Sequence, residues 1–384
     1  MVDYELAPEQ RDLRATVASF AREVVAPVIA DYYERGEFPY DIVAGMGKLG
    51  LFGLPFPEEF GGMGGDFLTL CLAIEELARV DSSVAITLDA AVTLGAMPVF
   101  RFGTDEQRDR WLPDLVAGER IAAFGLTEPG GGTDIPGTMR TTARLDGDEW
   151  VVNGTKAFIT NAGTSITSLV TVLALTGDGG ARENSTIIIP SGTAGFQPAP
   201  KYSKVGWCAS DTRELSFADC RVPAANLLGE RGRGYAQFLR ILDEGRVAIS
   251  ALATGLAQGC VDECTRYAND RVAFGVAIGR HQAIAFKLAD MAARVHAARL
   301  AWYDAAARMV AGAPFKKEAA MAKLLASNAA MDNARDATQI FGGAGFMNES
   351  PVGRFYRDAK ILEIGEGTSE VQRMLIARAL GVSG

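Results

Sequence analysis

The chain has 384 residues, of which 48% are apolar and 22% are charged, and its formal net charge is −9. This length predicts two or three domains, and this much apolar surface excludes a mainly disordered chain, because its burial offsets the lost chain entropy. The negative charge gives no general attraction for phosphate backbones, so we expect no nucleic-acid partner. With 2 histidines, 5 cysteines and no CxxC pair, the sequence predicts neither a metal site nor a disulfide framework.

Residues 1–120 are predicted to form an N-terminal helical domain. Apolar residues recur there near the 3.6-residue helical period, as in Leu6, Leu13, Val17 and Phe20. Thr104 is followed three residues later by Gln107, a capping-box pattern that predicts a helix start. No apolar run approaches the roughly 18 residues needed to cross a bilayer, so no membrane span is expected. The acidic N-terminus is unlike a signal peptide and indicates a soluble, cytoplasmic protein.

Residues 121–226 are predicted to form a β domain, either a small barrel or a sandwich. Short β-branched runs, such as the isoleucines at 187–189, are separated by clusters of Gly, Asp, Asn and Ser. Asn153-Gly154 is one candidate turn between strands.

Residues 227–384 are predicted to form a C-terminal helical bundle, because the stretch is rich in alanine and poor in proline. Breaks are expected near Ala313-Pro314 and Gly342-Gly343. Ser369 and Gln372 offer a capping box for a last helix. The predicted fold class is therefore mainly α with a central β domain.

Three glycine-rich loops are candidates for chemistry, at residues 126–134, 339–346 and 363–370. Consecutive glycines let backbone N–H groups approach a ligand, although a plain turn or a helix C-cap explains the same composition. In the third loop Glu366 lies between two glycines just before a helix start. It is either a carboxylate favoured by the helix dipole or a general base on a mobile, open loop.

Two further sites carry basic residues. Arg246, in the run Asp243-Glu244-Gly245-Arg246, is either a solvated charge or a substrate anchor. Arg271, with Phe274 and Gln282 beyond it, combines a cation, a ring and an amide, which suits a phosphate or an adenine ring. A helix-end cation beside a packed phenylalanine is the simpler alternative.

Together, these stretches resemble the acyl-CoA dehydrogenases, flavoproteins with a helical–β–helical fold, from about residue 5 to residue 381. The stretches that carry the resemblance are residues 127–134, 158–161, 204–223, 271–275, 339–345, 357–359 and 366–370. Their joint order and spacing are more specific than any one of them. The closest subfamily resemblance is to the short-chain and short branched-chain type.

The resemblance implies FAD as cofactor. Residues implied to border its flavin are Phe124, Leu126, Thr127, Gly132, Thr133, Phe158, Ile159 and Thr160. Residues implied to hold its pyrophosphate and adenosine, partly across a subunit interface, are Arg271, Phe274, Gln282, Gln339, Ile340, Phe341, Gly342 and Gly343. Thr368, Ser369 and Glu370 would also contact the cofactor. Implied substrate contacts are Thr133, Asp243, Glu244, Gly245, Arg246, Gly365 and Arg378.

The resemblance also implies the reaction. Glu366 would remove the α-proton of an acyl-CoA while the β-hydrogen leaves as hydride to flavin N5, giving a trans-2-enoyl thioester. A base in an apolar cleft would have a raised pKa. The implied partners are an electron-transfer flavoprotein and further copies of the chain in a homotetramer.

Three positions depart from the common family pattern. Gly365 replaces a tyrosine, Phe158 replaces a tryptophan, and Gly245 stands where some relatives carry their base. The alternatives that remain open are a flavin oxidase or monooxygenase, a dehydrogenase of carrier-protein-bound acyl groups, and a non-catalytic scaffold.

Overall fold

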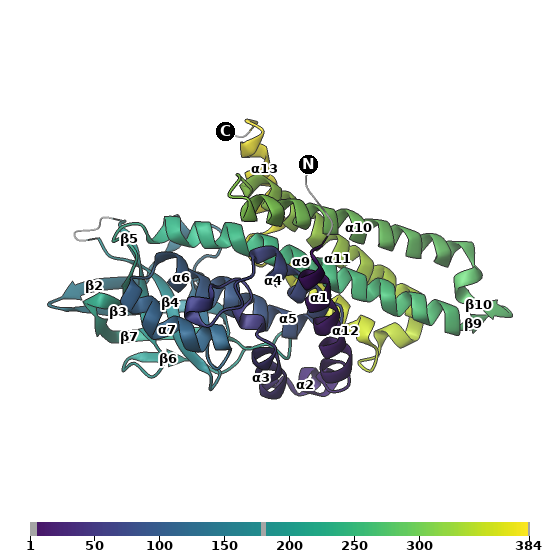
Figure 1. The fold of residues 1–384 in the computed structure, drawn as a ribbon, viewed down its shortest axis with the longest axis horizontal. Helices are drawn as coiled ribbons and strands as arrows, with labels where there is room; N and C mark the ends of the chain where they lie inside the picture. The colour runs from purple at the N-terminus through teal and green to yellow at the C-terminus, as the bar shows by residue number, and fades with distance from the viewer. Residues whose placement is uncertain (1–5, 178–181, 383–384) are drawn as a thin grey trace.

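The computed structural model describes residues 6–177 and 182–382, and the chain runs from helices to a sheet and back to helices (Figure 1). The N-terminal helices are α1 (Pro8–Phe20), α2 (Ile29–Arg35), α3 (Tyr40–Lys48), α4 (Phe67–Ala78), α5 (Ser82–Asp89), α6 (Met97–Phe102) and α7 (Asp105–Ala117). Two π-helical turns extend this set, η1 (Ala21–Val25) and η4 (Ala90–Ala96). Thr104 and Gln107 form a reciprocal cap at the start of α7, which confirms the predicted capping box.

The stretch Ser82–Phe102, from α5 through η4 to α6, is long and apolar enough by composition to cross a membrane. The expectation that no stretch reaches this threshold was therefore wrong. In the fold, 89% of the tested window is buried, as in the core helix of a packed protein, so its composition is weak evidence for a span.

One mixed sheet forms the middle of the chain. Its strands are β1 (Ile121–Gly125), β2 (Thr142–Asp146), β3 (Glu149–Thr160), β4 (Thr167–Leu175), β5 (Asn184–Pro190), β6 (Phe196–Pro198), β7 (Thr212–Pro223) and β8 (Leu227–Leu228). Their order is β6-β7-β3-β2-β4-β5-β8, and β1 pairs in parallel with β4. A short helix, α8 (Ile135–Thr138), lies between β1 and β2.

Gly154 lies inside β3 and not at a turn, so the predicted Asn153-Gly154 turn is wrong. The register against β7 shifts between Val152 and Gly154, and Gly154 has a φ of 146°. A Cβ there would lie 2.7 Å from the backbone of Thr141. The glycine therefore marks a bulge where another segment crowds the strand.

The C-terminal helices are α9 (Gly234–Asp270), α10 (Gln282–Val310), α11 (Lys316–Phe341), α12 (Pro351–Leu362) and α13 (Ser369–Ala379). The predicted breaks near residues 313 and 342 are confirmed. A two-stranded hairpin, β9 (Val272–Ala273) with β10 (Val276–Ala277), joins α9 to α10 at the end farthest from the sheet (Figure 1).

The cap of α13 differs from the prediction by one residue. Thr368, and not Ser369, is the N-cap, and its Oγ1 accepts from Val371 N at 3.3 Å. The Gln372 side chain donates back to Gly367 O at 2.8 Å.

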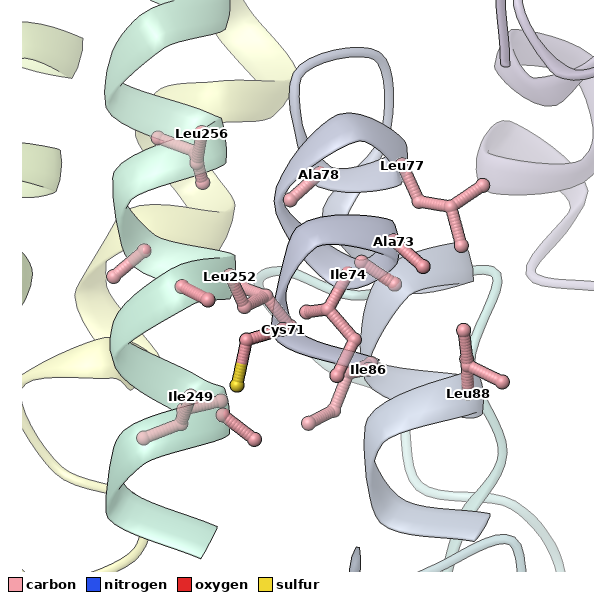
Figure 2. Close-up of a cluster of buried hydrophobic side chains, with 14 of the residues drawn as sticks. Cys71, Ala73, Ile74, Leu77, Ala78, Ile86, Leu88, Ile249, Leu252 and Leu256 are labelled. Atoms are coloured by element: carbon pink, nitrogen blue, oxygen red, sulfur yellow. The ribbon is translucent and has the colours of Figure 1, made fainter. Parts of the chain in front are cut away.

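The two helical segments share one hydrophobic core. Figure 2 shows side chains of α4 and α5 facing those of α9, among them Cys71, Ile74, Ile86, Leu252 and Leu256. Burying each large aliphatic side chain contributes about 1.5–3 kcal/mol. This contact fixes the N-terminal helices against α9, and α9 in turn carries residues of the candidate site.

Candidate active site

Glu366 lies in the short loop between α12 and α13, in a left-handed conformation with a φ of 53°. Gly367 follows with a φ of 90°, so the chain reverses tightly just before α13. Among the described residues, the N–H of Glu366 has no hydrogen-bond acceptor. An unpaired N–H beside a carboxylate is a donor that a ligand oxygen can use.

The carboxylate of Glu366 packs against Gly245 of α9. A Cβ at Gly245 would lie only 2.6 Å from Glu366 Oε2, so only glycine leaves this space. Oε2 is buried and has no hydrogen-bond partner within residues 6–177 and 182–382. Burial raises the pKa of Glu366 to about 7, and the charges of Lys323 and Arg246 oppose this rise. The expectation of a raised pKa at this position is confirmed.

The loop itself is held in place, so the expectation of a mobile loop is not supported by the contacts. Lys323 Nζ donates to Gly367 O at 2.9 Å, and Ser369 N donates to Glu363 O at 3.0 Å. Lys323 is buried, and this lowers its pKa to about 8, partly offset by the charge of Glu366. The base candidate is thus fixed by a buried cation and by backbone bonds.

The run 243–246 lies on α9 beside this loop, and its charges are paired. Arg246 is buried and forms an ion pair with Asp243, which Lys316 also approaches at 3.6 Å. Glu244 is buried and meets Arg101 at 3.3 Å, and burial raises its pKa. Arg246 Nε has no partner among the described atoms. The cation of Arg246 is therefore structural in part, and its buried Nε–H has no described acceptor.

The first glycine loop is attached to the sheet by a buried ion pair. Lys156 Nζ lies 2.8 Å from Glu128 Oε1 and 3.1 Å from Leu126 O. Thr127 O accepts from Ala157 N at 2.8 Å. Gly132 and Thr133 beyond it are exposed. The loop is therefore anchored at its start, and its glycine-rich end is exposed to solvent.

Phe124, at the end of β1, stacks on Phe238 of α9 with ring centroids 4.0 Å apart. Ile159 of β3 is buried and Thr160 is half-buried. Phe158 is 66% exposed and has a φ of 61°, which is unfavourable for a bulky residue. A strained, exposed ring beside an open loop fits the edge of a planar ligand.

The remaining cofactor candidates lie near the far end of α9. Arg271, Gln282 and Gln339 are exposed there, and Phe274 is 95% exposed in the hairpin. Phe341 stacks on Tyr267 of α9 at 4.1 Å, and Ile340 is buried. A Cβ added at Gly342 or at Gly343 would have no described atom within 4 Å. We call the set Arg271, Phe274, Gln282 and 339–343 the distal tip.

The distal tip and the flavin-side residues are separated by the length of α9. This helix has 37 residues and so spans about 55 Å. Phe238, beside the flavin-side residues, and Tyr267, beside the distal tip, lie about 44 Å apart along this helix. One extended dinucleotide therefore cannot touch both sets within a single chain. The predicted cofactor residues on the flavin side and at the distal tip therefore form two separate groups, and the other three, Thr368, Ser369 and Glu370, lie at the start of α13.

Three further candidates lie on α13. Ser369 is buried, and Glu370 and Arg378 are exposed. Arg378 lies in the last turn of the helix, about 14 Å along the axis from Ser369. Gly365, just before Glu366, has space around it, since among the described residues a Cβ would meet only Ile361, at 3.5 and 3.9 Å.

Three buried residues near the site were not among the predicted site residues. Asp89 at the end of α5 is fully buried, and burial, with the charge of Glu366 adding to it, raises its pKa. Lys323 and Lys156 are buried cations that hold loops. Each acts across a long stretch of sequence, so no local motif marks it.

Three family models match the chain in order. They are the N-terminal domain of acyl-CoA dehydrogenases over residues 7–119, the middle domain over 123–220 and the C-terminal domain over 232–381. The chain belongs to the acyl-CoA dehydrogenase family. Its members are flavoprotein oxidoreductases, so the predicted family, fold class and enzyme type are confirmed.

Acyl-CoA dehydrogenases from several sources are similar over the full chain. The chain is 46% identical to a probable acyl-CoA dehydrogenase of Bacillus subtilis, YngJ, covering 99% of this chain and 100% of the relative. The solved butyryl-CoA dehydrogenase of Megasphaera elsdenii is 40% identical, with a TM-score of 0.95 over 98% of this chain and 99% of that one. The prolyl acyl carrier protein oxidase AnaB is 32% identical, with a TM-score of 0.93 over 98% and 100%.

Proposed function

We propose that this acyl-CoA dehydrogenase family member converts an acyl-CoA thioester to the trans-2-enoyl thioester, with Glu366 as the base. The observation that carries the base assignment is the buried, unpartnered Oε2 of Glu366, whose pKa burial raises to about 7. A general base is most effective when its pKa lies near the working pH. Glu366 would take the α-proton of the thioester on a carboxylate oxygen.

The N–H of Glu366 supports a second role for the same residue. A thioester carbonyl gains negative charge as its α-proton leaves, and a fixed backbone donor stabilises that charge. The left-handed conformation at Glu366 turns this N–H away from backbone pairing, and the loop contacts of Lys323 keep it fixed. FAD, when bound, would accept the β-hydrogen as hydride at N5 and pass the electrons to an electron-transfer flavoprotein.

We infer that FAD is held by two copies of the chain. Phe124, the loop 126–133 and residues 158–160 suit the flavin, because they combine open glycines, hydroxyls and an exposed ring. Thr368 to Glu370 would contact the same cofactor from α13. The distal tip, with Arg271 and Gln282 beside the bare backbone of Gly342 and Gly343, suits the pyrophosphate and adenine. Since α9 separates the two groups, a partner's tip would complete each site, within the homotetramer expected from the family.

The substrate-side proposal rests on the residues around the loop. Thr133, the run 243–246, Gly365 and Arg378 remain the proposed acyl-CoA contacts. The open space at Gly365 enlarges that side of the acyl pocket, and a short or short branched acyl group is the proposed substrate class.

The test is anaerobic bleaching of the flavin by a panel of acyl-CoA thioesters that differ in length and branching. The wild-type protein should bleach rapidly with one subset. Glu366→Gln should keep its flavin but bleach at least about 10³-fold more slowly. Glu149→Gln is the matched control, because Glu149 pairs with Arg221 at 3.2 Å at the opposite end of β3 from residues 158–160. Full bleaching by Glu366→Gln would exclude it as the base.

A carrier-protein thioester is the second candidate substrate, and one observation favours it. The prolyl acyl carrier protein oxidase AnaB aligns over 98% of this chain with a TM-score of 0.93. Turnover of matched CoA and carrier-protein thioesters distinguishes the two. Rapid peroxide formation without an added electron acceptor would instead favour a flavin oxidase or monooxygenase.

A further inference from the structure

Lys156 of β3 is a cation with no exposed surface, and it lies at the base of the first glycine loop. Its Nζ donates to Leu126 O at 3.1 Å and lies 2.8 Å from Glu128 Oε1. The next residue, Ala157, donates its N–H to Thr127 O at 2.8 Å. Two consecutive residues of β3 therefore hold three consecutive residues of the loop.

Glu128 extends this anchorage to the start of β2. Its Oε2 accepts from Arg140 N at 2.6 Å, and its Oε1 accepts from Thr141 N at 3.0 Å, just before β2 begins at Thr142. These two bonds remain when the cation is replaced, so the carboxylate keeps backbone donors. A buried ion pair is weak evidence for stability, because desolvation offsets the attraction between its charges. The clearest effect of Lys156 is therefore expected on the position of the loop.

The same short piece of β3 carries the other segment that is proposed to border the flavin. The register of β3 against β7 shifts between Lys156 and Ile159, and Phe158 within this shift has a φ of 61°. Phe158 is 66% exposed there, while Lys156 and Ile159 are buried. Residues 158–160 and the loop 126–133 are thus joined at Lys156, and the spacing between them is set there.

The exposed end of the loop rests on the part that Lys156 holds. Glu128 N donates to Gly131 O at 3.3 Å, and Gly131 N donates to Glu128 O at 3.1 Å. A Cβ at Gly132 would lie 3.3 Å from Thr127 Cγ2, so Gly132 lies against Thr127. A shift of Thr127 or Glu128 therefore moves the glycines whose backbone is proposed to approach the flavin.

We propose that Lys156 is a positioning residue for the cofactor, which fixes the spacing between the loop 126–133 and residues 158–160 so that both border one flavin. The inference rests on the proposed function, because it takes FAD as the ligand that both segments border. Lys156 has no exposed surface, so it acts through Leu126 O and Glu128 and not by touching the cofactor. It sets the shape of the site that receives the flavin ring.

Lys156→Met tests the proposal, because methionine fills a similar volume but cannot donate to Leu126 O. The full-length apoprotein is titrated with FAD, and flavin fluorescence and visible absorption follow the binding. The dissociation constant for FAD should rise by about tenfold or more, and the absorption bands of the bound flavin should shift. In the apoprotein, the peptide that contains Ala157, whose N–H donates to Thr127 O, should exchange with deuterium faster.

Glu76→Gln is the matched control. Glu76 is also buried and ion-paired, with Arg14 and with Arg79, and it belongs to α4, which packs on α1 and α9. This variant should lower the thermal midpoint of the apoprotein, as Lys156→Met does. Its FAD affinity, its flavin bands and the exchange of the peptide that contains Ala157 should stay at wild-type values, because it leaves the loop anchorage intact.

If Lys156→Met does not fold, Lys156→Gln keeps a polar donor on a shorter side chain, and the same losses are expected from it. A folded variant with a lowered midpoint but wild-type FAD affinity, flavin bands and exchange would show that Lys156 serves stability alone, and this would overturn the proposal. A wild-type protein that takes up no FAD would contradict the proposed function itself, before any variant is compared.

Discussion

The loop around Glu366 and the distal tip differ in how many contacts they receive from their own chain. At the loop, Lys323 and Gln372 donate to Gly367 O, and Gly245 leaves space for the carboxylate of Glu366. Burial raises the pKa of Glu366 there, and the charges of Lys323 and Arg246 oppose this rise. At the tip, Phe274 is 95% exposed and the glycines at 342 and 343 face open space. The loop is held by contacts within one chain, whereas the tip is exposed and, by our proposal, meets another molecule. The two are held apart by α9, and this distance favours a second copy of the chain as that molecule.

The largest effect is expected when the two regions are damaged in different chains. Gly343→Val adds a side chain where no described atom lies within 4 Å, so the fold should tolerate it while the FAD site does not. Glu366→Gln removes the base and leaves the tip intact. Each variant alone should be inactive. Co-expressed, they should form mixed oligomers in which an intact loop meets an intact tip, and turnover should return.

The control for this experiment is co-expression of Gly343→Val with the double variant Gly343→Val/Glu366→Gln. That mixture contains no intact tip and should stay inactive. No restoration in the first mixture would mean that each chain builds its cofactor site alone, whereas activity in the control mixture would mean that Gly343→Val does not damage the cofactor site. Dehydrogenation assays on the purified oligomers, with flavin content measured in parallel, give the readout.

Gly245→Ala should affect only the loop. The new Cβ would lie 2.6 Å from Glu366 Oε2, so the carboxylate has to move. A displacement of about 1 Å at a reacting group can cost roughly 10²-fold in rate. At the same time alanine favours the helix by about 1 kcal/mol relative to glycine. We expect kcat to fall about 10²-fold without a matching loss of the thermal midpoint.

Gly365→Ala provides the comparison for that variant. Its Cβ would meet Ile361 only at 3.5 and 3.9 Å, so the loop has space for it. Its kcat should stay within a few-fold of wild type. Equal losses in the two variants would show that the loop responds to any added methyl group and that contact with the base is not the cause.

The contrast between loop and tip also marks what the sequence could predict. The glycine runs and Glu366, the proposed base, stand out because their neighbours in sequence are their neighbours in space. The cap at Thr104 and Gln107 is confirmed for the same reason, since both partners lie within one turn. The cap of α13 was assigned to Ser369, but Thr368 has the extended backbone that a cap requires, with a ψ of 165°.

Contacts between segments that are distant in sequence could not be predicted from local sequence patterns. Lys323 reaches Gly367 across 44 positions, and Gly245 faces Glu366 from another helix. Gly154 resembled a turn because its role depends on Thr141 and on a register shift against β7. The sequence motifs also do not say how far apart two elements lie in space. The length of α9 separates two groups of predicted site residues, and this separation could not be predicted from the motifs.

A smaller effect is expected at Lys323. Its charge opposes the raised pKa of Glu366, so Lys323→Met should raise that pKa further, by about one unit. The acidic limb of kcat/KM should move to higher pH by the same amount. Lys317→Met is the control on the same helix, since Lys317 pairs with Glu318 at 3.3 Å. A limb that moves downward, or moves equally in the control, would contradict the assignment of Lys323 as the opposing charge.

The smallest effect is expected at the cap of α13. Thr368 Oγ1 accepts from Val371 N, and this bond holds the first turn that follows the base. Thr368→Ala should cost about 1 kcal/mol of unfolding free energy. Thr368→Ser keeps the oxygen and should recover most of it. Because Lys323 and Gln372 still hold Gly367 O, turnover should fall by less than in Gly245→Ala. A larger loss of turnover in Thr368→Ala, recovered by Thr368→Ser and with flavin content unchanged in both, would mean that the helix cap fixes Glu366 more firmly than the buried cation does.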